Sequence, residues 1–544
     1  MPKAQARFIF VIGGVMSGIG KGIATASIAR ILKSKGFRVT CVKIDPYLNV
    51  DAGTMNPVEH GEVFVTEDGM ETDQDVGNYE RFLNENIYAG NYLTSGSVYL
   101  SVIERERALG YRGACVQPVP HVPEEIIRRL ERAATQAKAE FVLVEVGGTA
   151  GEYENLLFLE AARMMHLKDP ERVLFVLLSY LPIPVKIGEM KTKPTQHAAR
   201  ALNSAGVQPD FIIARAAVPL DAPRKRKLSI FCNVREEDII SAPDVNNIYE
   251  VPLNFEKEGL GDRILKKCGL KSRARDMKDW AAMVRRASSA KKEVKIGIVG
   301  KYFGTGKFIL SDSYISVIEA IKHAAWHWGQ KPQILWLDAE AYEKDSHRME
   351  EELSSLDGIL VPGGFGKRGV EGKIKAVEYA RTHAKPYLGL CYGMHMMTIE
   401  FARNVLGMQD ANTTEVDPKT THPVIDVMAG QKEKIFTKNM GGTMRLGAYR
   451  CRIEPHTIAA GAYGVREVKE RHRHRYEFND EFKAPMAAGG MIISGTNPES
   501  GLAEIMELKG HPFFVGTQFH PEFTSRPLSP HPLFREFIRA AIKE

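Results

Sequence analysis

The sequence predicts two α/β domains, each built on a parallel β-sheet. In the N-terminal half, short apolar runs are each followed by a polar or glycine-rich turn and then a helical pattern. These runs are Phe8–Ile12, Val39–Ile44, Phe141–Val146, Val173–Leu178 and Phe211–Ala214. Parallel strands covered by helices on both faces have this continuous apolar character. We therefore predict one α/β domain over residues 1–268.

A second series of the same kind predicts a separate α/β domain over residues 294–544. Its apolar runs are Val294–Gly300, Gln333–Leu337, Gly358–Pro362, Pro386–Leu390 and Phe513–Phe519. Residues 269–293 carry eight Lys or Arg against three acids, with one short helical pattern, and we interpret them as a linker. A length of 544 residues agrees with several domains, because a domain typically spans about 100–200 residues.

Composition limits the classes of function. With 44% hydrophobic and 26% charged residues, the chain lies in the ordinary globular range. A net charge of +6 is too dilute for a duplex-binding surface, so we expect no nucleic-acid partner. The six cysteines are never closer than 36 positions, which excludes a CxxC pair and favours a reducing compartment. Because no apolar run approaches a membrane span, we expect a soluble, cytoplasmic protein with no membrane partner.

The first predicted strand leads into a phosphate-binding loop, Gly13–Gly22, followed by a helical pattern over Ile23–Lys35. In such loops the backbone N–H groups and the helix N-terminus bind phosphate, and the lysine reaches its terminal oxygens. The loop departs from the usual pattern at two positions. Val15 stands where glycine is required, and Gly22 stands where a magnesium-binding Ser or Thr belongs. A plain glycine turn beside a surface lysine is the alternative interpretation.

If position 22 cannot bind magnesium, carboxylates elsewhere must do so. Asp75, in the stretch Glu71–Asp75, is expected in a polar loop, and Glu145 ends a predicted strand just before Gly147-Gly148-Thr149. Mg²⁺ prefers one or two carboxylates together with phosphate oxygens. Each acid alone would be read as a solvated loop acid or a helix cap, but beside the lysine loop they predict a magnesium site.

Further basic residues indicate more than one polyphosphate ligand. The run Lys191–Gln196 interleaves lysines with Thr and Gln, which can donate directed hydrogen bonds to phosphate and base. Lys43 opens the run Lys43–Tyr47, and Arg224–Lys227 alone would be a solvated charged face.

The C-terminal half contains a cysteine in the setting of a nucleophile. Gly389-Leu390-Cys391-Tyr392-Gly393 lies between an apolar strand and the helical pattern Met394–Val405. Glycines on both sides permit a sharp strand-to-helix turn, and the helix N-terminus stabilises a thiolate. A buried inert cysteine, the alternative, would not require these glycines.

Downstream, His520 and Glu522 follow the predicted strand Phe513–Phe519. A free thiol is mostly protonated at neutral pH, so an imidazole oriented by a carboxylate is its expected activator. We predict that Cys391, His520 and Glu522 form a catalytic triad. The glycine-rich turn Pro362–Gly366 offers N–H groups for an oxyanion hole, together with the amide after Cys391.

These motifs resemble the CTP synthase family over nearly the whole chain, and the C-terminal half resembles a class I glutamine amidotransferase. The motifs that carry the resemblance are Gly13–Gly22, Lys43–Tyr47, Val144–Thr149, Lys191–Gln196, Leu228–Val234, Arg471–Glu477 and Gln518–Ser525. The resemblance implies an N-terminal parallel-sheet domain of the P-loop, dethiobiotin-synthetase-like type. It also implies a flavodoxin-like glutamine amidotransferase domain.

The resemblance also implies ligand contacts. The expected ATP contacts are Gly18, Ile19, Gly20, Lys21, Gly22, Ile23 and Asp75, with Asp75 and Glu145 holding Mg²⁺. The expected UTP contacts are Ser17, Lys191, Thr192, Lys193, Pro194, Thr195, Gln196 and Lys227, and those of inhibitory CTP include Glu152, Tyr153 and Glu154. The expected glutamine contacts are Gly364, Tyr392, Gly393, Met394, His395, Glu415 and Arg475. The family elbow usually continues Leu-Gly-Met-Gln, whereas this chain has Tyr392-Gly393-Met394-His395.

The implied reaction is the ATP-dependent amination of UTP to CTP. ATP phosphorylates the 4-oxygen of UTP, and ammonia released from glutamine at Cys391 then attacks C4. Family members protect the ammonia in a passage between the sites, assemble as tetramers and are activated by GTP, for which Arg368 is a candidate contact.

Two other functions share some of these motifs. One is a P-loop ligase that amidates a carboxylate with glutamine nitrogen. The other is a nucleotide-gated scaffold with a relict glutaminase. The intact Lys21, Asp75, Glu145 and triad argue against decay.

Overall fold

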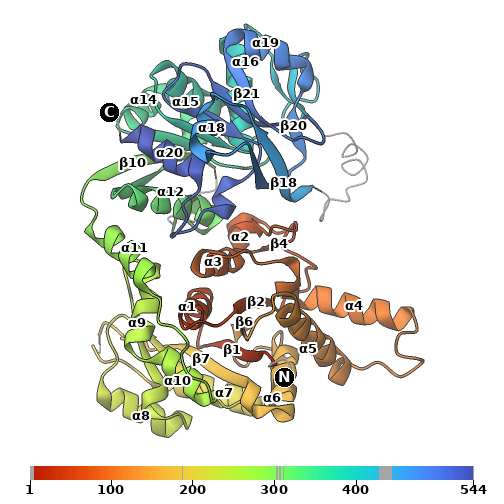
Figure 1. The fold of residues 1–544 in the computed structure, drawn as a ribbon, viewed down its shortest axis with the longest axis vertical. Coiled ribbons are helices and arrows are strands. Elements are labelled where there is room, and N and C mark those ends of the chain that lie inside the picture. The colour runs from red at the N-terminus through yellow and green to blue at the C-terminus, as the bar shows by residue number, and fades with distance from the viewer. Residues whose placement is uncertain are drawn as a thin grey trace. The chain divides into compact units, whose positions relative to one another are not determined.

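The computed structural model describes residues 5–186, 188–301, 304–305, 308–309, 311–427 and 444–542. The chain forms two compact units (Figure 1). Unit 1 comprises Met1–Ala52 and Asp75–Val284, and unit 2 comprises Gly53–Gln74 and Arg285–Glu544. In the described part of the chain, no helix has the length and apolar composition needed to cross a membrane.

Unit 1 contains a seven-stranded sheet in the order β5-β2-β6-β1-β7-β8-β9, with every neighbouring pair parallel. This confirms the parallel sheet predicted from the apolar runs. The strands are β1 (Arg7–Gly14), β2 (Val39–Asp45), β5 (Tyr92–Thr94), β6 (Phe141–Thr149), β7 (Val173–Tyr180), β8 (Phe211–Ala216) and β9 (Ile239–Pro243). Side chains on both faces of β1 are buried, which explains its continuous apolar run.

Helices cover both faces of this sheet. Helix α1 packs against β1, β2 and β6, with α9 and α10 beside it, and α5, α6 and α7 pack on the opposite face around the main core. The helices are α1 (Lys21–Ser34), α3 (Gln74–Leu83), α4 (Ser95–Arg107), α5 (Pro118–Gln136), α6 (Leu156–Lys168), α7 (Lys193–Ser204), α8 (Ala222–Cys232), α9 (Val251–Lys257), α10 (Leu260–Lys267) and α11 (Lys278–Ser289).

Helix α11 lies within the predicted linker and packs on unit 1. The side chain of Trp280 is fully buried, and its indole N–H donates to the carbonyl of Tyr249 at 2.8 Å. Arg30 of α1 stacks over the same indole ring, 5.0 Å from its centroid. The predicted linker, although rich in basic residues, therefore contains one buried residue, Trp280, that packs against unit 1.

Unit 2 contains a nine-stranded mixed sheet in the order β13-β10-β14-β15-β23-β22-β21-β18-β19. Its first five strands are parallel, as predicted, and the remaining pairings are antiparallel. The strands are β10 (Glu293–Gly300), β13 (Lys331–Asp338), β14 (Gly358–Val361), β15 (Tyr387–Leu390), β18 (Arg445–Ile453), β19 (Glu467–His474), β21 (Met491–Thr496), β22 (Ala503–Leu508) and β23 (Phe514–Thr517).

Two cores flank this sheet. Helices α12 (Ile315–His327), α18 (Ile458–Tyr463) and α20 (Pro532–Ala541) bury apolar residues on one face. Helices α13 (Ala339–Lys344), α14 (Ser346–Ser354), α15 (Val370–Thr382), α16 (Tyr392–Asn404) and α19 (Lys483–Gly489) do so on the other. Strand β15 and the first turn of α16 are thus buried between packed layers, with Cys391 between them.

Residues 53–74 pack in unit 2, although they fall within the predicted first domain. They contain α2 (Pro57–His60), β3 (Val63–Val65) and β4 (Glu71–Asp73). The rings of Phe64 and Phe523 lie 5.1 Å apart, and the fully buried Arg471 donates to the carbonyl of Val65 at 3.0 Å. This segment therefore supplies side chains to unit 2.

Candidate functional sites

The phosphate loop runs between β1 and α1 in a strained conformation. Gly18 and Gly20 have φ values of 71° and 86°, in the left-handed region that glycine tolerates. Val15 also has a positive φ of 80°, which a β-branched residue rarely adopts. The loop therefore keeps a glycine conformation at the position where the sequence lacks glycine, which favours the phosphate loop over a plain turn.

Lys21 begins α1 and points along the carboxyl edge of the sheet. Its ammonium donates to the carbonyl of Gly148, just after the buried part of β6, at 2.8 Å. Burial lowers the pKa of Lys21, and Glu145, Asp75 and Glu152 act in the opposite direction. The structure thus brings Lys21, Asp75 and Glu145 together, as the sequence predicted.

The carboxylate of Asp75 explains why position 22 is glycine. A Cβ atom added to Gly22 would lie 1.9 Å from Oδ1 of Asp75, far inside contact distance. A Ser or Thr at position 22 and Asp75 in this place are therefore mutually exclusive. The carboxylate occupies the space in which an ordinary phosphate loop places its hydroxyl.

A buried ammonium holds the two predicted metal ligands together. Lys43 Nζ lies 2.5 Å from Asp75 Oδ2 and 3.0 Å from Glu145 Oε1, and Tyr79 donates to the other oxygen of Glu145. Burial, reinforced by the Asp75 charge, raises the pKa of Glu145 to about 7. Burial opposes ionisation of Asp75 as well, but the Lys43 charge together with hydrogen bonds from neighbouring side chains outweighs it, and the pKa of Asp75 is lowered.

Two carboxylates are too few to form a metal site alone. Among the described residues, no group of three or more His, Cys, Asp or Glu side chains is arranged to hold a metal ion. Mg²⁺ characteristically completes its octahedron with water and substrate phosphates, so the acid pair fits a magnesium ion that arrives with a nucleotide. A divalent cation here would replace the Lys43 ammonium as partner of at least one acid.

The run Lys191–Gln196 lies at the start of α7, beside the phosphate loop. A Cβ atom added to Gly14 would lie 2.4 Å from Ala198 Cβ, so the loop and α7 are in contact. Thr195 is buried and bonded to Ser179 at 2.8 Å, and Gln196 donates to Thr192 at 3.1 Å. Lys191 pairs with Glu189 at 2.6 Å, and Lys193 is exposed.

Other predicted nucleotide contacts are more open to solvent. Ser17 is exposed on the phosphate loop, Lys227 is exposed on α8, and Tyr153 is 88% exposed. Glu152 accepts a hydrogen bond from Thr149 at 2.6 Å, beside the Gly148 carbonyl that Lys21 contacts.

Sequence reasoning missed Arg215, which lies on β8. Its guanidinium donates to the carbonyl of Ile19 at 3.3 Å and pairs with Asp244 at 2.5 Å. Together with Gly20 and the apolar side chains of Ile23, Val245 and Phe255, it lines a small cleft beside the phosphate loop. An arginine directly after the apolar run Phe211–Ala214 was the available signal.

Cys391 occupies a strained turn between β15 and α16. Its φ of 49° is in the left-handed region, and its N–H donates to Thr517 at 2.6 Å. A Cβ atom added to Gly393 would lie 2.2 Å from the carbonyl of Val361, and one added to Gly389 would lie 2.7 Å from Gly393. The two glycines are therefore required by close backbone approach, as expected for a nucleophile elbow.

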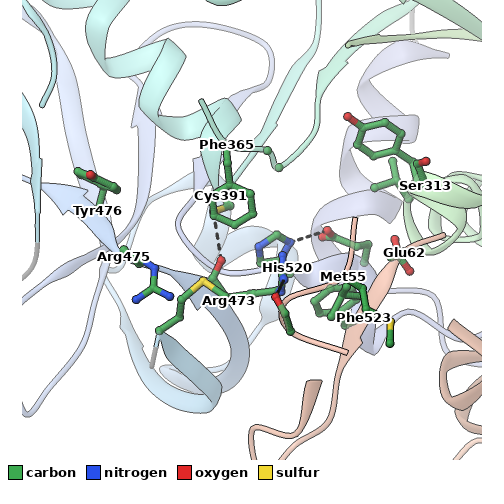
Figure 2. A pocket seen from close by; sticks show the side chains of 18 of the residues that line it. Met55, Glu62, Ser313, Phe365, Cys391, Arg473, Arg475, Tyr476, His520 and Phe523 are labelled. Atoms are coloured by element: carbon green, nitrogen blue, oxygen red, sulfur yellow. Dashed lines mark hydrogen bonds and ion pairs between the residues drawn. The ribbon is translucent and has the colours of Figure 1, made fainter. Parts of the chain in front are cut away.

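His520 lies beside Cys391 (Figure 2), and Glu522 lines the same cavity. The imidazole Nδ1 is 2.7 Å from Glu522 Oε1, so the carboxylate orients the ring. Burial alone would lower the pKa of His520, but Glu522 and the Cys391 sulfur together raise it to about 10. A Cβ atom added to Gly363 would lie 2.8 Å from His520 Cε1, so this position must also be glycine.

A cavity of about 500 Å³ opens at the nucleophile. Its lining includes Cys391, His520, Gly364, Glu415 and Arg475, so three predicted glutamine contacts face it. Phe365 and Arg473 also border it, and residues 53–55 and 62–63 contribute a further wall (Figure 2).

The other four predicted glutamine contacts lie below the cavity wall. Tyr392, Gly393, Met394 and His395 are buried in the first turn of α16, and none of them lines the cavity. The Tyr392 hydroxyl donates instead to the carbonyl of Gly366 at 2.7 Å. Side-chain contacts from these four residues to glutamine are therefore not supported, whereas backbone contacts remain open to them.

Glu415 is the acid of the cavity. Its Oε1 accepts from the N–H of Gly366 at 2.7 Å, and burial raises its pKa. Two lysines lie near it. Lys301 donates to the carbonyl of Phe365, and Lys373 is fully buried with its ammonium 4.9 Å from the centroid of the Tyr392 ring.

Lys373 forms no hydrogen bond among the described residues. Burial lowers its pKa to about 7, and the like charge of Lys301 adds to this effect. Arg368, the candidate GTP contact, lies nearby in sequence but is exposed and pairs with Glu340 at 2.5 Å.

Comparison with known proteins covers nearly the whole chain. A family model described as CTP synthase N-terminus matches residues 7–270, and one described as Glutamine amidotransferase class-I matches residues 309–540. The chain is 50% identical over 540 residues to a CTP synthase of Carboxydothermus hydrogenoformans, covering 99% of both proteins. It is 51% identical to a CTP synthase of Methanothermobacter thermautotrophicus, again over 99% of both.

A solved structure described as the Trypanosoma brucei CTPS glutaminase domain with bound acivicin is 37% identical. The match covers 46% of this chain and 94% of that one, with a TM-score of 0.43.

We expect Lys373→Met to stabilise the protein, most of all at low pH. The folded-state pKa of about 7 lies below the ordinary value of 10.5, so the cost of burying the ammonium is full below pH 7. This cost disappears as the pH rises toward 10.5, because the amine is then neutral in both states. At roughly 1.4 kcal/mol per pKa unit, the gain at pH 6.5 amounts to a few kcal/mol.

Denaturant unfolding of the full chain at pH 6.5 and about pH 9.5 measures this difference. Lys375→Met is the matched control, because Lys375 lies on the same helix and donates to the carbonyl of Tyr342 at 3.1 Å. A gain for Lys373→Met that is equal at both pH values would contradict the expectation.

Proposed function

The chain belongs to the CTP synthase family, whose reaction is the ATP-dependent amination of UTP to CTP with nitrogen from glutamine, and we propose that its two side-chain clusters divide this reaction. Unit 2 releases ammonia from glutamine at Cys391, and unit 1 activates UTP at the phosphate loop. The observation that supports two separate roles is that the chain contains two distinct groups of reactive side chains. One is the strained Cys391 with His520 and Glu522, and the other is Lys21 with the nearby carboxylates. An amidoligase acting on a carboxylate is not favoured, because the family match spans both parts of the chain.

In unit 2, the proton of the Cys391 thiol resides on His520, whose pKa is raised to about 10, and the thiolate sulfur attacks the side-chain amide carbon of glutamine. The negative charge moves to the amide oxygen, and we propose that the N–H groups of Gly364 and Tyr392 donate hydrogen bonds to it. His520 returns the proton to the leaving nitrogen, and ammonia departs from a thioester. A water molecule, deprotonated by His520, then releases glutamate and regenerates the thiol.

The cavity lining suits the charged end of glutamine. We assign Glu415 to the α-ammonium group and Arg475 to the α-carboxylate, because these opposite charges both face the cavity. Gly364 leaves room for the substrate, since a side chain there would enter the cavity beside Lys373 and Lys301. Backbone groups of residues 392–395 complete the proposed glutamine-binding site.

In unit 1, ATP binds along the loop Gly18–Ile23, with its terminal phosphates on Lys21 and the N-terminus of α1. The small cleft beside Arg215 and Phe255 offers apolar walls and a guanidinium plane, which suit a purine base. Phosphate transferred to the 4-oxygen of UTP turns that oxygen into a good leaving group for ammonia.

Magnesium fits beside this loop. We propose that Asp75 and Glu145 hold it, and that when bound it neutralises charge on the ATP phosphates. Asp75 occupies the space of the missing hydroxyl at Gly22, and Tyr79 orients Glu145. The Lys43 ammonium favours the ionised form of both acids and so opposes the burial that raises the pKa of Glu145.

The pyrimidine nucleotides are assigned to the neighbouring surface. We propose that Ser17, the run Lys191–Gln196 and Lys227 bind UTP, and that Glu152, Tyr153 and Glu154 contribute to binding of CTP as an inhibitor. Contact between α7 and the phosphate loop supports this assignment, because the residues proposed for UTP then adjoin those proposed for ATP. We further propose that GTP activates the enzyme, with Arg368 as one of its contacts. We also propose that the protein assembles as a homotetramer. Its proposed location is the cytoplasm, where ATP, UTP and glutamine are present.

Replacing Cys391 by Ala is expected to abolish glutamine-dependent CTP formation while ammonia-dependent formation continues. The thiol is needed only to release nitrogen, so the loss with glutamine reaches at least about a thousandfold. Both rates are measured as conversion of UTP to CTP. Cys115→Ala, at an exposed cysteine, is the control. An equal loss with both nitrogen sources in a folded variant would refute the division of roles.

Lys21→Met is expected to lower activity with either nitrogen source, by about a hundredfold or more, because it removes a charge that stabilises the transferring phosphate. Lys33→Met, at the other end of α1, removes a cation that contacts only Leu83 and Glu85 among the described residues and keeps most activity. Near-normal ammonia-dependent activity in Lys21→Met would show that the loop is only a turn.

Asp75→Asn and Glu145→Gln are expected to raise the Mg²⁺ concentration required for UTP-dependent ATP hydrolysis. Each removes one negative charge from the proposed site and leaves basal glutamine hydrolysis unchanged. Gly22→Ala should act in the same direction, since its Cβ displaces the Asp75 carboxylate. Calorimetric titration of Mg²⁺ in the presence of ATP provides a second measurement. An unchanged Mg²⁺ requirement in all three variants would direct the search to Asp45, Asp51 or Asp73.

A further inference from the structure

Three buried side chains form a hydrogen-bonded chain that ends at the nucleophile. His395 Nε2 lies 3.0 Å from Gln518 Oε1, and Gln518 Nε2 lies 3.8 Å from Cys391 Sγ. Their exposed fractions are 2%, 0% and 3%, so water does not compete for these contacts. His395 lies in the first turn of α16, and Gln518 lies between β23 and His520.

The two ends of the Gln518 amide fix which group donates in each of these two hydrogen bonds. The oxygen of Gln518 can only accept, so His395 must carry its proton on Nε2 and donate it. The amino end of Gln518 is then directed at the sulfur. A reversed amide would place its oxygen against the thiolate and repel it.

The surroundings of His395 keep its ring neutral. Burial lowers the pKa of His395 to about 4, so at neutral pH the ring carries one proton. His474 from β19 and Glu477 from β20 (Tyr476–Phe478) are ionisable groups near it, and they pair with each other at 2.8 Å. The phenol ring of Tyr392 also lies near it, with the ring centroids 5.9 Å apart. At Cys391 the neighbours are His520 and the carbonyl of Arg473, 4.0 Å from the sulfur.

We propose that His395 is a positioning residue for glutamine hydrolysis, acting through Gln518. It fixes the amide orientation in which the Gln518 amino group donates to Cys391 Sγ, and this donor stabilises the thiolate. The proposal rests on the proposed role of Cys391 as nucleophile. It gives Gln518 a role in activating the thiol in addition to that of His520.

This role explains how the chain tolerates histidine where the family elbow usually has glutamine. In both side chains three bonds separate Cβ from Nε2, so both can present a donor at the same place. Methionine has a similar length but no proton to donate. His395→Gln should therefore preserve the hydrogen-bond relay from residue 395 through Gln518 to Cys391, whereas His395→Met should break it.

The test compares the rate of Cys391 alkylation by iodoacetamide across the pH range in the full-length protein. For His395→Met and Gln518→Met we expect the midpoint of the profile to rise by about one pH unit. Glutaminase kcat/KM at neutral pH should fall by about tenfold, with ammonia-dependent CTP formation retained. His395→Gln should resemble the wild type in both measurements. Thr398→Val, three residues further along α16, controls for disturbance of the buried helix, because its hydroxyl contacts only Met394 and Met506 among the described residues.

A double variant separates a relay from two unrelated packing effects. His395→Met combined with Gln518→Met should shift the profile no further than either single change, because both remove the same donor. Additive shifts would overturn the proposal, as would an unshifted profile in His395→Met. If Cys391→Ala retained glutamine hydrolysis, the proposed nucleophile itself would be wrong, which is a different and recognisable outcome.

Discussion

The turn from a parallel strand into a helix is the constraint on which both sites depend. At such a turn the chain must reverse within a few residues, and the helix N-terminus then faces the edge of the sheet. In unit 1 the reversal places Val15, Gly18 and Gly20 at positive φ, and in unit 2 it places Cys391 there. The surrounding sheet and helices hold these unfavourable conformations. What differs is the group that each turn presents, a row of N–H groups with Lys21 or a single sulfur.

Close approach at glycine then arranges the charged groups. Asp75 can lie against α1 only because Gly22 has no side chain, and His520 can lie beside Cys391 only because Gly363 has none. In each case a carboxylate and a cation meet in a buried space. Lys43 contacts both Asp75 and Glu145 and lowers the pKa of Asp75, while Glu522 raises the pKa of His520. The two arrangements differ in sign: a central cation contacts two acids in unit 1, whereas an acid contacts the imidazole in unit 2.

The features that were predictable from the sequence are those with a local signature. Buried parallel strands have continuous apolar runs, and the phosphate loop and the elbow have fixed glycine spacing, so both sheets and the positions of Lys21 and Cys391 followed directly. The antiparallel strands β18, β19, β21 and β22 did not, because strands such as β19 carry charged side chains that are buried through ion pairs such as Arg473 with Glu71. Long-range pairing leaves no local pattern, and for the same reason Arg215 and the His395–Gln518 contact were missed.

Residues 53–74 pack in unit 2 but lie between two segments of unit 1 in the sequence, so they connect the two units along the chain. Glu71 of β4 accepts a hydrogen bond from Arg473 at 2.9 Å, and the carbonyl of Arg473 is the oxygen nearest to the Cys391 sulfur among its described hydrogen-bond partners. Only residues 72–74 separate Glu71 from Asp75, the proposed magnesium ligand. Strand β4, which Arg473 contacts in unit 2, is therefore followed two residues later by Asp75, the acid that lies against Gly22 in unit 1.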